Sequence, residues 1–164
     1  TAQAIILACG FGSGLPEKIG LGEITDFVSG AQAEVNTIDI DEVEVYFGQK
    51  PFPGFFGWLV PTNHDKGLAG LLVANAPALY LRNFLHHLRA QGKIASTEAD
   101  MKFGTIPLGT LPRTYSDRMI VVGDAAGQVK PTTGGGIYYG LLCADIAANC
   151  LVCIIPRCHL PLLL

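Results

Sequence analysis

The stretch that most constrains the fold is RMIVVGDAAGQVKPTTGGGIYYG, at residues 118–140. Residues 119–122 are continuously apolar, which predicts a strand covered on both faces in a layered α/β arrangement. Gly123 allows a tight turn after this strand, and Asp124 places a carboxylate at the strand's carboxyl end, where open α/β sheets bind ligands. Because an ionised carboxylate only accepts hydrogen bonds, Asp124 suits the hydroxyl groups of a ribose.

The same stretch continues into a glycine-rich loop and the start of a helix. After Pro131, the glycines at 134–136 leave the surface free of side chains, so backbone N–H groups at the helix start can approach an anionic or electron-rich ligand. Taken singly, a Gly-Asp pair or a run of glycines marks an ordinary turn or a flexible loop. Their combination with the buried strand and the small residues at 125–127 favours a cofactor-binding loop.

This combination, with a proline seven residues after the aspartate, resembles the second FAD-binding motif of the flavoprotein hydroxylase and geranylgeranyl reductase superfamily. In that superfamily the equivalent of Asp124 binds the ribityl or ribose portion of FAD, and the loop matching residues 131–137 lies along the isoalloxazine ring. The resemblance therefore implies that FAD is bound by Gly123, Asp124, Pro131, Thr133, Gly134, Gly135, Gly136 and Ile137.

A second segment, PGFFGWLVP at residues 53–61, matches the spacing of the PxxYxWxFP signature of geranylgeranyl reductases. Both prolines and Trp58 are retained, whereas Phe56 replaces the usual tyrosine and Val60 the usual phenylalanine. The resemblance implies that Phe56 and Trp58 line an isoprenoid pocket, without a phenolic hydroxyl at position 56. From the residues alone the segment predicts an aromatic strand bounded by prolines, and a place in the core is the alternative to a ligand wall.

Near the amino end, IILACGFGSGL at residues 5–15 is similar to the A-D-G-x-x-S element of these flavoproteins, with Cys9 at the usual aspartate position. No GxGxxG is present, since GFGSGL lacks the third-glycine spacing and the crossover helix that holds a pyrophosphate. The chain is therefore expected to be the carboxyl-terminal portion of a longer flavoprotein, missing its amino-terminal half, with an incomplete FAD site.

The middle of the chain predicts a largely antiparallel sheet and one helix. In one alternating segment, Val43, Val45 and Phe47 share a face, which is typical of a half-buried strand. A helix is predicted at 77–91, with Asn75 as its cap and Gly92 as its stop. Its apolar stripe comprises Leu81, Phe84, Leu85 and Leu88, and its two histidines, His86 and His87, are expected at the surface. The predicted strands are 33–40, 42–48, 67–75 and 99–108.

These elements together predict an α+β fold. An antiparallel-sheet substrate domain is expected at 16–108, and the incomplete carboxyl-terminal part of an α/β FAD-binding domain at 1–15 and 109–150. Residues 151–164 form an atypical apolar tail with two prolines, to which no function is assigned.

Composition narrows the classes of partner. The chain has 164 residues, of which 49% are hydrophobic and 15% charged, and this apolar surplus is interpreted as an interface to the missing half or to a lipid. A net charge of −3 without a Lys/Arg cluster argues against nucleic acid. No segment has the length of a bilayer span or the basic start of a signal peptide, so a cytoplasmic protein is expected, with peripheral membrane contact as an alternative.

Four of the five cysteines lie near the carboxyl end. Cys150 and Cys153, with Cys158 and His159, have zinc-ligand residue types, but a proline interrupts the segment. We therefore predict no metal site, and interpret Cys143 and Cys150 as small apolar residues of a buried helix.

The resemblance implies FAD-dependent reduction of carbon–carbon double bonds in a geranylgeranyl group of an isoprenoid lipid. Phe56, Trp58 and Tyr138 are expected to shape the alkene site, and no residue is identified as the catalytic proton donor. NADPH and ferredoxin are both open as electron donors. Two alternatives are an FAD-dependent aromatic monooxygenase, which shares the Gly-Asp motif, and a truncated fragment without catalytic activity.

Overall fold

The computed structural model describes residues 2–154, which form two compact units. One unit is Phe27–Ile106, and the described residues before and after it form the other. The sheet unit therefore begins at residue 27, not at the expected residue 16. The reason is that Leu21 and Ile24 are buried in the core of the other unit, beside Val121. The ten residues at 155–164 of the predicted tail lie outside the described residues.

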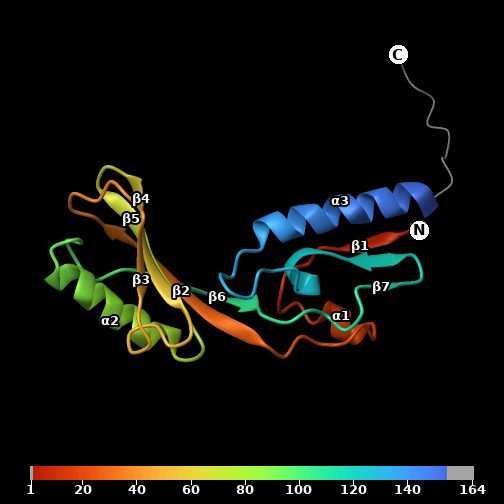
Figure 1. Ribbon diagram of the computed structural model, residues 1–164, viewed down its shortest axis with the longest axis horizontal. Helices are drawn as coiled ribbons and strands as arrows, with labels where there is room; N and C mark the ends of the chain where they lie inside the picture. Colours follow the sequence, from red (N-terminus) through yellow and green to blue (C-terminus); the bar gives the residue numbers. More distant parts are fainter. Residues whose placement is uncertain (1, 155–164) are drawn as a thin grey trace, which may run out of the picture. The chain divides into compact units, whose positions relative to one another are not determined.

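The discontinuous unit contains a small sheet with the strand order β1-β8-β7 (Figure 1). The first two strands are parallel, with Ile6 opposite Ile120, and β7 pairs with β8 in the antiparallel sense. Its elements are β1 (Ile5–Leu7), α1 (Leu15–Lys18), β7 (Tyr115–Ser116), β8 (Met119–Val121), the 3-10 helix η1 (Gly123–Ala126) and α3 (Ile137–Ile154). A buried cluster beneath the sheet comprises Leu21, Ile24, Leu111, Val121, Ala125 and Ala126.

The second unit is an antiparallel sheet with one helix against one of its faces (Figure 1). The strand order is β3-β4-β5-β2-β6, so β5 and β2 are central. Alternation along β2 and β5 directs Ala31, Ala33 and Leu71 into a core that the helix completes. The elements are β2 (Phe27–Asn36), β3 (Glu44–Phe47), β4 (Phe56–Asn63), β5 (Lys66–Val73), α2 (Pro77–Ala90) and β6 (Met101–Pro107).

Helix α2 confirms the predicted stripe but not the predicted cap. Its four predicted apolar residues are all buried, and His86 and His87 are exposed as expected. The residue at the cap position is Ala76 rather than Asn75, with a left-handed φ of 53° and no side-chain hydrogen bond to the helix. Pro77 in the first turn presets φ for the helix and has no N–H, and the Leu79 N–H donates to the Ala76 carbonyl at 3.1 Å in place of a side-chain cap.

Strand β3 is half-buried as predicted, but its apolar face is the exposed one. Val45 and Phe47 are exposed, by 50% and 76%, whereas Glu44 and Tyr46 lie on the side of α2. The sheet therefore has one face covered by the helix and one open face, to which apolar side chains of β3 contribute.

Candidate functional site

The predicted cofactor loop follows directly from β8. Gly123 adopts φ 69°, which favours glycine, and turns the chain into η1. Its N–H donates to Oε1 of Gln128 at 2.7 Å, and the N–H of Gln128 donates back to the Gly123 carbonyl at 3.1 Å. The Gln128 side chain thus closes the loop around Asp124.

The Asp124 carboxylate lies against the start of the glycine-rich helix entry. A Cβ at Gly136 would be 2.9 Å from Oδ1 of Asp124, so a side chain at 136 would displace the carboxylate. Within residues 2–154 this half-buried carboxylate makes no hydrogen bond or ion pair. It is therefore free to accept hydrogen bonds from hydroxyl groups of a ligand.

The loop at 131–137 is held by its own backbone. The N–H of Lys130 donates to the Gly135 carbonyl at 3.0 Å, and the N–H of Gly134 donates to the Lys130 carbonyl at 2.9 Å. Gly135 is paired with Lys130 in an isolated antiparallel bridge, whereas the N–H of Gly136 donates to no described residue. Pro131, Thr133, Gly135 and Ile137 are exposed, so this loop lies at a surface, with the Gly136 N–H as its candidate donor.

The amino-end segment forms a glycine-rich turn after β1. Gly10, Gly12 and Gly14 all have positive φ, between 67° and 80°. Cys9 Sγ lies 3.0 Å from the hydroxyl of Ser13, so a thiol and hydroxyl pair occupies the place where the resemblance expects an aspartate.

The second group of predicted site residues lies on the open face of the other unit. Phe47, Phe56 and Trp58 form a strip there, with ring centroids 6.1 Å and 5.9 Å apart. Their strand neighbours Gly57 and Leu59 are the residues that face the core, so the aromatic rings of β4 are not core residues. The indole N–H of Trp58 donates to Oε1 of Gln32 at 3.2 Å.

A groove of about 250 Å³ adjoins Trp58 on this face. Leu72 and Ile106 supply apolar lining, Gln32 supplies an amide, and Gly30 and Gly104 contribute backbone without side chains. The groove is also lined by Lys102 and Thr105. The aromatic strip and the apolar part of this groove together suit an alkyl or alkenyl chain.

Tyr138, the third residue predicted for the alkene site, belongs to the other unit. It lies in the first turn of α3, is 69% exposed, and makes an edge contact with Tyr139 at 5.3 Å between ring centroids. Its place in an alkene site stays a prediction.

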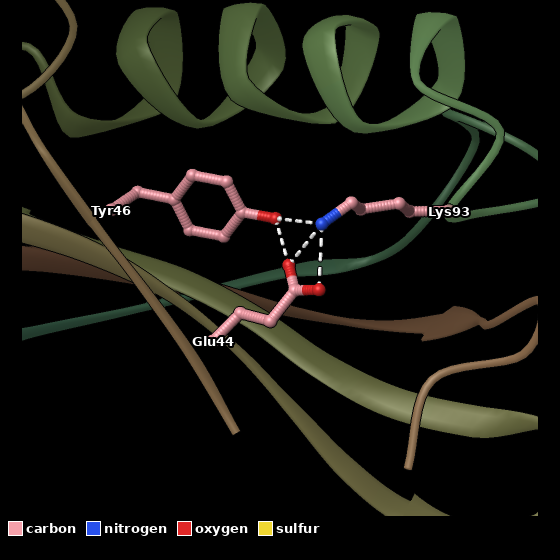
Figure 2. A network of polar contacts seen from close by, with 3 residues as sticks. All are labelled: Glu44, Tyr46 and Lys93. Carbon is pink, nitrogen blue, oxygen red and sulfur yellow. Dashed lines mark hydrogen bonds and ion pairs between the residues drawn. The ribbon is translucent and has the colours of Figure 1, made fainter. Parts of the chain in front are cut away.

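Sequence reasoning missed a hydrogen-bonded cluster of Glu44, Tyr46 and Lys93, shown in Figure 2. The Lys93 ammonium donates to both Glu44 carboxylate oxygens, at 2.6 Å and 2.5 Å, and to the Tyr46 hydroxyl at 3.2 Å; that hydroxyl donates to Glu44. Tyr46 also packs edge-on against Phe84 of α2, at 4.9 Å between centroids. The alternation of β3 signals a shared face for Glu44 and Tyr46, but no local pattern indicates that Lys93 joins them.

The electrostatics of this cluster follow from its contacts. The hydrogen bond from Lys93 lowers the pKa of Glu44 below its ordinary value, and the same bond raises the pKa of Lys93. Burial raises the pKa of the Tyr46 phenol, and the hydrogen bond to Glu44 raises it further. At neutral pH the cluster is an ion pair with a neutral tyrosine, which fixes β3 to the chain after α2.

A larger hollow, of about 760 Å³, lies in the discontinuous unit. It lies between α3, which contributes Cys143, Ile146 and Cys150, and the chain at 114–122. The interpretation of Cys143 and Cys150 as buried is wrong, because Cys150 is exposed and Cys143 only half-buried. Cys158 and His159, of the zinc set considered above, lie outside the described residues.

No family model matches the chain. It is 34% identical to a digeranylgeranylglycerophospholipid reductase of Methanococcus aeolicus, over 90% of this chain and 40% of that protein. It is 35% identical to digeranylgeranylglycerophospholipid reductase 2 of Methanothermobacter thermautotrophicus, over 88% and 39%. The chain thus spans about 40% of the length of these curated relatives.

Solved structures share the fold. A geranylgeranyl bacteriochlorophyll reductase-like protein from Thermoplasma acidophilum superposes with a TM-score of 0.77 at 24% identity, over 90% of this chain and 40% of that one. A flavin-dependent brominase superposes with a TM-score of 0.70 at 12% identity, over 93% and 43%.

The chain thus shares the fold of the matched parts of these two solved structures. Over about 90% of its length, the chain is similar to a portion of the curated digeranylgeranylglycerophospholipid reductases. The predicted fold class and the predicted resemblance to geranylgeranyl reductases are confirmed. In the part of the chain that the structure describes, no helix is long and apolar enough to cross a membrane.

Proposed function

We propose that this chain supplies the isoprenoid-binding sheet and one side of the FAD site in a reductase that saturates carbon–carbon double bonds of a geranylgeranyl lipid. The observation that carries the proposal is the open face with Phe47, Phe56 and Trp58, on a sheet whose other face packs against α2. Curated relatives that are 34% and 35% identical to this chain are named digeranylgeranylglycerophospholipid reductases. Because the chain spans about 40% of their length, the activity is proposed for the complete flavoprotein.

The described residues of the loop after β8 fit a flavin. The Asp124 carboxylate has no partner within residues 2–154, and the glycine at 136 leaves room beside it. Asp124 would accept hydrogen bonds from hydroxyl groups of the cofactor, and the N–H group of Gly136 would donate to it. When bound and reduced by an electron donor, FAD would supply the hydride for the alkene.

The chain's own residues would bind and orient the substrate. On the open face, Phe56 and Trp58 would pack against the isoprenoid chain and displace water from it, which disfavours side reactions. We include Tyr138 in the alkene site on the strength of the family resemblance.

We propose NADPH or ferredoxin as the electron source, and contact with a membrane surface as a consequence of the lipid substrate.

A chimera tests this proposal. The part of the Methanococcus aeolicus relative that this chain does not match is joined to the full 164-residue chain, and the purified protein is incubated with dithionite and digeranylgeranylglycerophospholipid. We expect near-stoichiometric flavin absorbance and a mass gain of two hydrogen atoms for each reduced double bond. A chimera that binds flavin but leaves the lipid unreduced would contradict the proposal, and an aromatic substrate assayed with oxygen consumption tests the monooxygenase alternative.

The loop is tested separately by Asp124→Ala in the same chimera. Removing the acceptor should weaken FAD binding by about 10- to 100-fold, because hydrogen bonds to charged groups contribute about 1.5–3 kcal/mol each. The measurement is quenching of flavin fluorescence on titration. Asp117→Ala, an exposed aspartate of the same unit, is the matched control and should bind FAD as the parent does. Equal affinity of the Asp124 variant would remove this residue from the site.

A further inference from the structure

Trp58 lies in a row of residues that crosses four strands of the open face. Val45 of β3 is opposite Trp58 of β4, which is opposite Gly70 of β5, which is opposite Gln32 of β2. Adjacent strands are about 4.8 Å apart, so the backbones of β4 and β2 are roughly 10 Å from each other. The Trp58 indole nevertheless donates to Gln32 at 3.2 Å. Its ring therefore extends across the whole width of β5.

Gly70 makes this arrangement possible. A Cβ at position 70 would lie 2.5 Å from Cε2 and 2.7 Å from Nε1 of Trp58, distances that real atoms do not adopt. The indole therefore rests on the bare backbone of Gly70, with one ring face against the sheet and the other turned away from it. Any larger residue at position 70 would lift the ring and pull its N–H away from Gln32.

Gln32 fixes the other end of the ring. Its amide oxygen accepts the only hydrogen bond that an indole N–H can donate, so rotation of the ring about its side-chain bonds would break that bond. Gln32 and Trp58 also both line the groove of about 250 Å³. The position of the indole thus sets the shape of one groove wall.

We propose that Gln32 and Gly70 are positioning residues that hold the Trp58 indole flat across β5, where its outer face forms a wall for an apolar chain. The proposal rests on the proposed function, because the chain that would contact this face is the isoprenoid of the substrate. Neither residue needs to contact the reacting carbon atoms: Gly70 acts through the space that it leaves, and Gln32 through its hydrogen bond.

The chain provides a direct probe, because Trp58 is its one tryptophan. Time-resolved fluorescence anisotropy and acrylamide quenching are measured on the full ligand-free chain, for the parent and for Gln32→Leu, Gln32→Glu and Gly70→Ala. We expect a new fast anisotropy component and faster quenching for Gln32→Leu and Gly70→Ala, with parent-like values for Gln32→Glu, which keeps an acceptor oxygen. Asn36→Leu, an exposed site on the same strand β2, is the matched control.

Ligand binding is then measured by calorimetry with geranylgeraniol in detergent micelles. We expect about fivefold weaker binding by Gln32→Leu, which corresponds to about 1 kcal/mol, and recovery in Gln32→Glu. Unchanged indole mobility in Gln32→Leu, or a mobile indole without loss of affinity, would overturn the proposal. Failure of the parent chain to bind geranylgeraniol would instead contradict the proposed function, and the anisotropy comparison would still decide whether Gln32 and Gly70 position the ring.

Discussion

At the scale of single residues, glycines decide which chain segments can approach one another. Gly127 is the clearest case in the cofactor loop. It has φ 70°, and a Cβ there would overlap the carbonyl oxygen of Gly109 and lie 2.9 Å from Cα of Thr110. The hydrogen bond from the Leu111 N–H to the Ala126 carbonyl, at 3.0 Å, also holds these two chain segments close together. The small-residue run before the glycine-rich loop is therefore a packing requirement as well as part of the predicted cofactor motif.

Gly127→Ala should destabilise the chain strongly. The substitution adds left-handed strain of about 1 kcal/mol and a backbone clash that only a shift of the loop relieves, so we expect a loss of about 2–4 kcal/mol in the free energy of unfolding. Urea denaturation followed by circular dichroism measures this loss. Gly104→Ala is the control, because a Cβ at 104 would meet no atom within 4 Å, and it should change stability by less than about 0.5 kcal/mol. Equal effects of the two substitutions would contradict the argument.

Residue-scale features of the cofactor loop could be read from the sequence because they are local. A turn at Gly123, a carboxylate at Asp124 and a loop free of side chains before Ile137 all follow from neighbouring residues. Gln128, whose side chain closes the loop, could not be assigned, because glutamine at a surface loop has no distinctive pattern. Gln32 could not be assigned either, because its hydrogen-bond partner Trp58 is 26 positions away in the sequence.

At the scale of elements, β3 depends on the polar cluster beneath it. Glu44 and Lys93 form an ion pair at 2.5 Å, with their side chains only 29% and 28% exposed. The lowered pKa of Glu44 means that its contribution to stability is present above the unfolded pKa, near 4.5, and is lost as pH falls through the folded value. The raised pKa of Lys93 means that its contribution is lost only above its ordinary value of 10.5. The ion pair is therefore fully formed at neutral pH.

Glu44→Gln should remove part of the acid sensitivity of the chain. Between neutral pH and pH 3, the parent should lose about 1 kcal/mol more unfolding free energy than the variant. Chemical denaturation at a series of pH values provides the measurement. Glu34→Gln is the matched control, since the Glu34–Lys66 pair is more exposed and should have a smaller effect. A pH profile of Glu44→Gln that parallels the parent would show that the cluster does not stabilise β3.

Element positions were predictable where side-chain periodicity was regular. Helix α2 is an example, because four large apolar residues recur on one face. Strand β2 begins at Phe27, well before the predicted residue 33. The sequence does not indicate this early start, because the inward residues at 31 and 33 are alanines and the spacing from Val28 to Ala31 breaks the alternation. The face of β3 that was expected to be buried is exposed for a different reason. Alternation shows that the strand has two faces, but the packing of α2 against Tyr46 determines which face is covered.

At the scale of the whole molecule, the two compact units differ in how completely each forms its own core. Residues 27–106 are continuous in sequence and contain a buried cluster that joins the sheet to α2. The other unit has a parallel pair, β1 with β8, of only three residues per strand, and Ile5 and Ile6 of β1 are each 47% exposed. Parallel strands are normally covered on both faces, but β1 is partly exposed within the described residues. In the continuous unit, by contrast, α2 covers one face of the sheet.

The fragment of residues 27–106 is therefore expected to fold alone. It should show a cooperative urea transition and dispersed amide NMR signals, because its thirteen-residue buried cluster lies within these boundaries. Leu85→Ala, at a fully buried position of α2, should cost about 2–5 kcal/mol, whereas Leu79→Ala, 54% exposed on the same helix, should cost less than about 0.5 kcal/mol. A fragment that remains unfolded, or two leucine variants with equal stability, would show that this sheet needs the rest of the chain. A folded fragment would place the aromatic strip on an independent domain, since Phe47, Phe56 and Trp58 all lie within it.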